Sequence, residues 1–594
     1  MDKREILYIP TLLSTKGRRR KKMVTKHVLS PHANTEAITN TAASDTLTLS
    51  IDFTQKYPAK QHCRNVAARL SPQHTTGSSS SSNNSHPRAL IYLPSARTTY
   101  PPYSDQPNLH RQLRHFYYLS GCPLADSHLT YDIAAGKLTL YIPPLNPKEV
   151  LWTGMPPSID DCLATYNVDE VKSSSELRED LDAWVLAGRH ASPASADTSM
   201  PTAMAVEGVI YCLDETSLPP PSPDKQQMDP TALAASAAVG WEWASLSGII
   251  LNTMRLRPAI DDCRAYKDAF EISLLRNAIA VTRSAHIAVQ TLLRRTQGLM
   301  PELALENLTE ADLEGVFRGT CVALHAKYQA YDPIVCTGRA CSTLHYTRNS
   351  APLGPSKQLL LIDAGAEWDC YAADITRTYP LNGVWTTEAK AVYAIVDRMQ
   401  REGISRTVAG APWRESHYLA ARVATEGLLN LGVFTGGNTS SRVDEIYHAG
   451  TWRAFFPHGL GHMIGLECHD VEGTPDDKSG YDPHLSSTCT LPPQHRPRQG
   501  HLPLPPVAHG ENEVGVLVNR IIKPGMVLTV EPGIYFCEWI IKPYLSDPKH
   551  KDFIDSEVLD RYWDVGGVRI EDMVLVLGEG EGNEVLSKHI PKGW

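Results

Sequence analysis

Four clusters of acidic and histidine residues in the second half of the chain stand where packing alone would not place them. A single carboxylate after a strand often only begins a turn or caps a helix. Asp363, however, follows three apolar residues where a buried strand would normally continue. In chain order the clusters are Asp363 and Asp374 in LLIDAGAEWDCYAADITRTYP (360–380), His458, His462 and His469 in HGLGHMIGLECHD (458–470), Glu531 in GMVLTVEPGIYF (525–536), and Arg569 and Glu571 in GGVRIEDMVLV (566–576).

Taken together, the four carboxylates point to bound cations rather than to four unrelated turns. Carboxylates buried side by side raise one another's pKa or force the site apart. Two divalent ions would balance four ionised carboxylates, and one neutral imidazole could join without disturbing that balance. We therefore predict a dinuclear metal site whose ligands are Asp363, Asp374, His462, Glu531 and Glu571.

The predicted ligand set is rich in oxygen and contains one nitrogen. Such a set suits Mn²⁺ or Co²⁺ better than an ion that prefers thiolates. We predict two Mn²⁺ ions per chain and leave Co²⁺ and Zn²⁺ open as alternatives. Paired ions about 3.5–4 Å apart ionise a shared water and polarise a carbonyl oxygen, so hydrolysis is the expected reaction class.

Two better-known motifs are excluded. HGLGH (458–462) lacks the general-base Glu of the zinc-protease motif HExxH, and its two glycines oppose a helix. GTPDDKS (473–479) fails as a phosphate loop, because Asp477 stands where the second Gly must precede the Lys.

Bulk composition limits the classes of partner. A chain of 594 residues with 42% hydrophobic and 21% charged residues predicts a globular protein of about two domains. The net charge of −9 argues against a nucleic-acid partner, and no apolar run approaches the roughly 18 residues of a membrane span. The 12 cysteines form no CxxC pair, so we predict reduced thiols and a cytoplasmic location. The basic run KGRRRKK (16–22) leaves a nuclear or organellar address open.

Shifts in composition divide the chain. We predict a disordered tail over 1–49, and strand signals that alternate with helical stretches predict a small α/β domain over 50–235. Apolar residues at three-to-four spacing predict a long helix over 268–295, and Thr309 with Asp312 resembles a capping pair for the next one. We also expect Thr387 to cap a helix. Linkers are predicted at 75–88, 190–202 and 218–230, and a Pro-rich insertion at 474–512.

At its four clusters the sequence resembles the pita-bread metallopeptidases, the superfamily of creatinase and methionine aminopeptidase. The quoted motifs look like its proline-specific branch, which holds Xaa-Pro aminopeptidase P and prolidase. RQLRHFYYLSGCPLADSHLTYDI (111–133) with LTLYIPP (138–144) resembles the N-terminal domain of aminopeptidase P. The resemblance implies an α/β (α+β) protein in which a small N-terminal α/β domain precedes a C-terminal pita-bread catalytic domain over 265–594.

The resemblance also implies a role for each predicted ligand. Asp363 would bind one metal, and Asp374 and Glu571 would bridge both. His462 and Glu531 would hold the second metal, with Glu531 close enough to shuttle a proton.

On the substrate side, the resemblance implies that His458 and His469 face the peptide. His469 would support the carbonyl oxygen as it becomes tetrahedral, since an imidazole donor stabilises developing negative charge. His345 in CSTLHYT (341–347) matches the family's substrate-side histidine, and Arg569 would orient the site or contact the peptide.

The activity expected from the resemblance is release of the N-terminal residue from peptides with proline in second position, by a homodimer. Two alternatives stay open. One is a dipeptidase that accepts only Xaa-Pro, because it would share all five ligands. The other is a binding module that has lost its metals, although here the ligand set is complete. The insertion at 474–512 is longer than this branch usually carries, and we expect it to lie in solvent.

Overall fold

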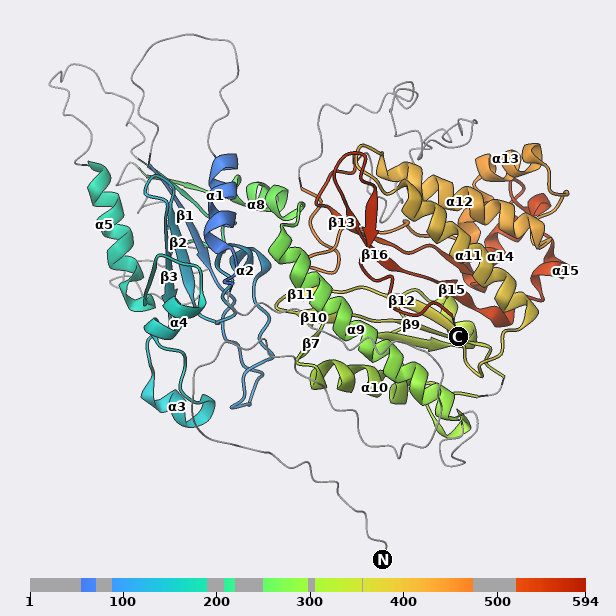
Figure 1. Ribbon diagram of the computed structural model, residues 1–594, viewed down its shortest axis with the longest axis horizontal. Coiled ribbons are helices and arrows are strands. Elements are labelled where there is room, and N and C mark those ends of the chain that lie inside the picture. Colours follow the sequence, from blue (N-terminus) through green and yellow to red (C-terminus); the bar gives the residue numbers. More distant parts are fainter. Residues whose placement is uncertain are drawn as a thin grey trace, which may run out of the picture. The chain divides into compact units, whose positions relative to one another are not determined.

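The computed structural model describes residues 55–70, 88–189, 208–219, 249–296, 305–354, 356–473 and 520–593. The predicted tail, the three linkers and the Pro-rich insertion lie outside these residues, except for a few positions at their edges. By their contacts the described residues from 55 onward belong to one compact unit, and Figure 1 labels their helices and strands. None of the described helices is long and apolar enough to cross a membrane.

The N-terminal part is built on a six-stranded sheet in the order β4-β3-β2-β1-β5-β6. Its first three strands form an antiparallel meander, and β4, β5 and β6 join it in parallel. The strands are β1 (Arg88–Pro94), β2 (His128–Asp132), β3 (Lys137–Ile142), β4 (Glu170–Ser173), β5 (Gly208–Tyr211) and β6 (Ile249–Asn252). Strands therefore form in the part where strand signals predict them, and β6 continues the sheet beyond residue 235, where we predict the domain to end.

Within the described residues six helices accompany this sheet, and α1 packs against α2 and α8. In chain order the helices are α1 (Ala59–Leu70), α2 (Arg114–Ser120), α3 (Pro147–Thr153), α4 (Ile159–Thr165), α5 (Leu177–Arg189) and α8 (Leu256–Arg264). The apolar core of this part is continuous with the rest of the chain, since Phe116 and Leu129 share one buried cluster with Leu275 and Tyr371.

A buried polar cluster joins α1 to the beginning of α9 (Ala269–Thr296). His62 donates from Nδ1 to the Tyr118 carbonyl over 2.8 Å, and its Nε2 lies 3.1 Å from Asp268 Oδ2 and 3.9 Å from Glu271 Oε2. Tyr371 donates to Glu271 Oε1 over 3.0 Å. Burial raises the pKa of Glu271 to about 7. Burial opposes the charged form of His62, yet the nearby carboxylates raise its pKa.

Several short sheets carry the predicted site residues in the C-terminal part. Their orders are β11-β10-β7, β12-β9-β8, β13-β16-β17 and β14-β15. The strands are β7 (Tyr328–Gln329), β8 (Ile334–Thr337), β9 (Leu359–Asp363), β10 (Ala366–Trp368), β11 (Tyr371–Ala372), β12 (Thr376–Pro380), β13 (Val527–Val530), β14 (Gly533–Tyr535), β15 (Gly567–Arg569), β16 (Asp572–Val576) and β17 (Asn583–Val585). As expected from its apolar run, β9 is buried along its whole length.

Helices α9 and α10 pack on each other, as do α11 and α12, which lie side by side in Figure 1. The helices of this part after α9 are α10 (Glu310–Ala323), α11 (Thr387–Arg406), α12 (Trp413–Asn430), α13 (Ser440–Ala449), α14 (Glu538–Ser546) and α15 (Ser556–Leu559). The predicted capping pair is confirmed, because Asp312 accepts hydrogen bonds from the Thr309 backbone and hydroxyl. The expected cap at Thr387 is wrong by one position: Thr386 caps α11 by accepting from the Ala389 N–H.

Close backbone contacts explain two glycines in the quoted motifs. A Cβ at Gly461 would lie 2.0 Å from the Thr529 carbonyl oxygen, and one at Gly365 would lie 1.7 Å from that of Ala373. Real Cβ atoms never come so near, so only glycine lets these segments approach. The first contact sets the segment before His462 against β13, and the second closes the hairpin that separates Asp363 from Asp374.

Candidate metal centre

Asp363 and Asp374 are brought together by one phenol. Asp363 ends β9 and pairs in register with Thr376 of β12, so Asp374 lies just before that strand. The Tyr331 hydroxyl lies 2.5 Å from Asp363 Oδ1 and 2.6 Å from Asp374 Oδ1. Both carboxylates are buried. The phenol therefore holds one oxygen of each acid and leaves the other free to meet a different partner.

His462 lies between Asp374 and Glu531. Its Nε2 is 3.5 Å from Asp374 Oδ2 and 3.4 Å from Glu531 Oε1. Its Nδ1 donates to the Met463 carbonyl over 3.0 Å, which fixes the ring so that Nε2 faces the two acids. The hydroxyl of Thr529 accepts from the His462 N–H and donates to Glu531 Oε1, so it sets the distance between the two residues.

Glu531 and Glu571 occupy the break between two strand pairs. Val530 of β13 pairs with Asp572 of β16. Glu531 follows Val530 and Glu571 precedes Asp572, so the two glutamates lie at the same end of this strand pair. Glu571 Oε2 accepts from the Thr376 hydroxyl over 2.7 Å. Glu571 Oε1 is buried and has no hydrogen-bond partner among the described residues.

The backbone around Glu571 is fixed by a second buried charge. Arg377 of β12 donates to the Glu571 carbonyl over 2.6 Å and pairs with Asp572 over 2.8 Å, with both charged side chains fully buried. These contacts connect β12, which follows Asp374, to the segment that contains Glu571.

The four acids crowd one another electrostatically. Burial raises the pKa of Asp363, of Glu571 and of Glu531, the last to about 7, and nearby carboxylates add to each shift. Burial opposes ionisation of Asp374 as well, but His462 outweighs it and holds that pKa well below its ordinary value. The same carboxylates outweigh burial at His462 and raise its pKa to about 9. The four carboxylates thus carry more negative charge than His462 can balance, and a bound cation would supply the missing positive charge.

This donor set fits divalent cations. Donor atoms of Asp374, His462 and Glu571 lie within 4.8 Å of one another, and the unpartnered Glu571 Oε1 belongs to the same group. Carboxylate oxygens with one imidazole nitrogen match the ligand preference of manganese-type ions. Asp363 and Glu531 adjoin this group, through Tyr331 and His462 respectively. All five predicted ligands therefore lie close together.

A chain of hydrogen bonds leads from Arg569 to His458. Arg569 donates from Nη2 to Asp363 Oδ2 over 2.6 Å and from Nη1 to the Tyr535 hydroxyl over 3.1 Å. His458 donates from Nδ1 to the Gly459 carbonyl over 2.7 Å, so its Nε2 accepts from Tyr535 over 2.9 Å. Burial lowers the pKa of His458 to about 3, and Arg569 acts in the same direction. His458 is therefore neutral at ordinary pH.

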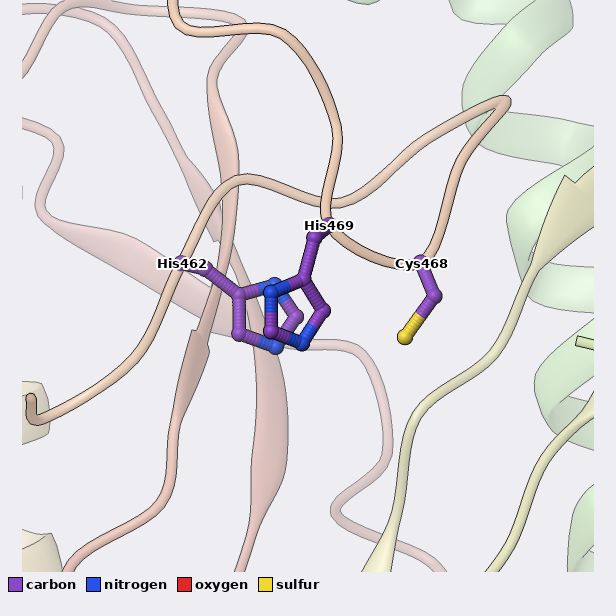
Figure 2. Close-up of side chains that lie close together, drawn as sticks. All are labelled: His462, Cys468 and His469. Carbon is purple, nitrogen blue, oxygen red and sulfur yellow. The ribbon is translucent and has the colours of Figure 1, made fainter. Parts of the chain in front are cut away.

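The other two predicted histidines lie at the exposed side of the cluster. His469 is exposed, and its ring stacks on that of His462 with centroids 3.9 Å apart, as Figure 2 shows. Burial, His462 and His345 lower the pKa of His469. His345 is exposed just after the short helix η6 (Gly338–Ser342), near enough for its charge to lower the pKa of His458 and His469.

Three residues of the site are absent from the prediction. They are Tyr331, Tyr535 and Cys468, whose Sγ donates to Asp374 Oδ2 over 2.9 Å. Tyr535 and Cys468 belong to the quoted motifs, yet neither is the kind of residue that a search for carboxylates and imidazoles selects. Tyr331 lies in AYDPIV (330–335), and its position after a strand is the only signal that could have marked it.

Comparisons with known proteins identify the family of the chain. A model of metallopeptidase family M24 matches residues 273–577, and a model of the aminopeptidase P N-terminal domain matches 62–191. A probable Xaa-Pro aminopeptidase of Verticillium alfalfae is 37% identical over 530 residues, 89% of this chain and 94% of that protein. One of Tuber melanosporum is 39% identical over 531 residues, 89% and 93% of the two chains. Among solved structures, aminopeptidase PepP of Pseudomonas aeruginosa has a TM-score of 0.61 at 26% identity, and the match covers 90% of this chain and 96% of that one.

Proposed function

This chain belongs to metallopeptidase family M24, and from that premise we propose that it is an Xaa-Pro aminopeptidase, which releases the N-terminal residue from peptides with proline in second position. The resemblance seen in the sequence is confirmed, as is the expected mixed α/β fold with an aminopeptidase P-type N-terminal domain and a pita-bread domain. The observation that carries the proposal is that relatives named for this activity match about nine-tenths of the chain.

We propose two Mn²⁺ ions as the metals, held by Asp363, Asp374, His462, Glu531 and Glu571. The close grouping of these donors and the excess of buried negative charge support the proposal. When bound, such a pair would ionise a water and polarise the scissile carbonyl. The oxygen-rich set favours Mn²⁺ over Zn²⁺.

The chain's own residues would divide the remaining work. Glu531, whose pKa burial raises to about 7, is suited to take a proton from the attacking water and pass it to the leaving proline nitrogen. His469, exposed and close to His462, would donate to the carbonyl oxygen as charge develops. His345 would contact the substrate from the same side. Arg569 would hold the Asp363 carboxylate in place, and through Tyr535 it is linked to the neutral His458, which would hold the wall of the site.

We further propose that the chain acts as a homodimer in the cytoplasm. A run of exposed apolar side chains on the N-terminal part supports self-association, since Leu151, Trp152 and Met155 are 84%, 74% and 71% exposed. Reduced thiols support the compartment, because the 11 cysteines within the described residues are all free.

Substrate length tests the proposed activity. Purified chain in metal-free buffer, with Mn²⁺ added back, is assayed on a matched Xaa-Pro dipeptide and an Xaa-Pro-Xaa tripeptide. We expect hydrolysis that depends on Mn²⁺ and includes the tripeptide. Cleavage of the dipeptide alone would identify a dipeptidase, and failure both to bind Mn²⁺ and to hydrolyse either peptide would identify a binding module.

A further inference from the structure

We propose that His462, Cys468 and His469 form a second metal site, which captures a thiophilic ion such as Zn²⁺ or Cd²⁺ in competition with the pair held by the carboxylates. The inference rests on the proposed function for one of its ligands, His462, and it adds a way in which soft metals would regulate the same centre. Figure 2 shows the three side chains gathered on one loop, with the two imidazole rings face to face.

The distances suit a single ion. One donor atom from each of the three residues can be chosen so that all lie within 4.8 Å of one another. Around a tetrahedral zinc with bonds of about 2.0–2.3 Å, neighbouring ligands lie roughly 3.3–3.8 Å apart. The His462 and His469 rings are stacked with their centroids 3.9 Å apart, and an imidazole nitrogen binds an ion in the plane of its ring. Binding therefore requires side-chain rotations that turn a nitrogen of each ring and the Cys468 sulfur toward one ion.

The loop that presents these donors is anchored. The Asp470 N–H donates to the Met463 carbonyl over 2.8 Å, and the Ala372 N–H donates to the Gly465 carbonyl over 2.8 Å. The Asp470 side chain is buried against Arg264 at 2.6 Å and Lys267 at 3.1 Å. The backbone on both sides of Cys468 is thus held in place, so the loop would lose less conformational entropy when a metal binds.

The chemistry of the donors separates the two sites. Two imidazole nitrogens and a thiolate select zinc-like ions, whereas carboxylates select manganese-like ions. In the absence of a soft metal, the Cys468 thiol donates to Asp374 Oδ2, and its sulfur is not one of the ligands that we propose for the oxygen-rich site. A soft ion would bind the sulfur as a thiolate, with the thiol proton released to solvent, and would draw His462 Nε2 away from Asp374 Oδ2 and Glu531 Oε1, which lie 3.5 Å and 3.4 Å from that nitrogen. The carboxylate pair would then lose its nitrogen ligand, and His469 would no longer be free for the substrate.

The test is a titration of the full-length, Mn²⁺-loaded chain with Cd²⁺. Thiolate-to-metal absorption in the ultraviolet reports sulfur ligation, and electron paramagnetic resonance of free Mn²⁺ reports displacement. Cys468→Ser and Cys468→Val are compared with the wild type, and Cys370→Ser is the control, since Cys370 is another partly buried free cysteine on a turn of its own. We expect the wild type and Cys370→Ser to show the band and release Mn²⁺. In both Cys468 variants we expect no band and a Cd²⁺ affinity lower by about tenfold or more.

Retention of the band in both Cys468 variants, or its absence from wild type that binds Mn²⁺, would overturn the second site. Neither readout depends on catalysis, so the two proposals fail separately. Mn²⁺-dependent hydrolysis without a Cd²⁺–thiolate band would leave the aminopeptidase standing and remove this inference. A Cys468-dependent band in a chain without peptidase activity would do the reverse.

Discussion

Arg569 donates a hydrogen bond from Nη2 to Asp363 Oδ2 over 2.6 Å, although the two residues lie 206 positions apart in the chain. Both side chains are almost fully buried. The guanidinium thus hydrogen-bonds one oxygen of Asp363, a carboxylate that we propose as a metal ligand, and this bond fixes the direction in which its other oxygen points.

From this contact we predict that Arg569→Lys lowers kcat/KM by about 10–100-fold, the usual cost of losing a hydrogen bond to a metal ligand. The guanidinium donates to Asp363, Tyr535 and Thr376 from three separate nitrogens in a planar fork, and the single nitrogen of an ammonium cannot reproduce that geometry. Steady-state kinetics on an Xaa-Pro-Xaa peptide measures the effect. Arg401→Lys, at an exposed pair with Asp397, is the matched control. Equal kinetics for both variants would remove Arg569 from the site.

We predict that Asp374→Ala reduces turnover by at least about a thousandfold and lowers the bound metal, because a carboxylate shared by two ions holds both. Metal analysis of dialysed protein accompanies the activity assay. Asp397→Ala, a partly exposed acid on α11, controls for the loss of a carboxylate. Wild-type turnover at saturating Mn²⁺ would contradict the assignment of Asp374 as a bridge.

Tyr331→Phe tests the phenol that joins two of the acids. Its hydroxyl lies within hydrogen-bonding distance of both Asp363 and Asp374, so we expect Mn²⁺ affinity to fall by about tenfold, with saturating metal restoring most activity. Isothermal titration with Mn²⁺ gives the affinity. Tyr393→Phe loses a buried hydroxyl of α11 for which no hydrogen bond is found, and it should bind Mn²⁺ as the wild type does. An unchanged Mn²⁺ affinity in Tyr331→Phe would show that the Tyr331 hydroxyl is not needed to orient the Asp363 and Asp374 carboxylates.

His469→Ala should lower kcat by about 10²–10³-fold while metal content stays intact, since we assign His469 to the substrate carbonyl rather than to the carboxylate-bound pair. Metal content and kcat are measured on the same preparation. His448→Ala, at an exposed position on α13, is the control. Loss of Mn²⁺ in His469→Ala would mean that the residue is structural.

Stability should fall as the pH rises from about 4.5 to about 7, because of Glu271. Its pKa is raised by burial from 4.5 to about 7, so the folded chain holds a proton that the unfolded chain has released. The stabilisation is complete below the lower value and is lost as the pH passes the upper one, by at most about 3 kcal/mol. The raised pKa of His62 acts with the same sign.

Melting temperatures between pH 4.5 and 8 test this for wild type and Glu271→Gln. The variant should lose part of the pH dependence, and Glu579→Gln, at an exposed loop position, should keep it. Parallel curves for wild type and Glu271→Gln would show that the cluster around His62 does not titrate in this window.

Much of the fold and the four proposed carboxylate ligands could be predicted from the sequence, because these acids lie at or beside the ends of strands. Asp363 after Leu360, Leu361 and Ile362 is the clearest case, since burial of that strand is seen directly. The rest depends on contacts between distant segments. Nothing near Tyr331 in sequence indicates that its hydroxyl meets Asp374, and nothing near Cys468 indicates that its thiol does.

The long sequence separation between β9 and β15 has a consequence for biosynthesis. The acids of β9 and its hairpin leave the ribosome some two hundred residues before Arg569 and Glu571 do, so the nascent chain exposes an incomplete set of the proposed ligands until both groups have been made. Because contacts of such long sequence separation form late, metal loading at the proposed site would report that β9 and β15 have both been made and have met. A chain that stops before Glu571 would lack one of the proposed ligands.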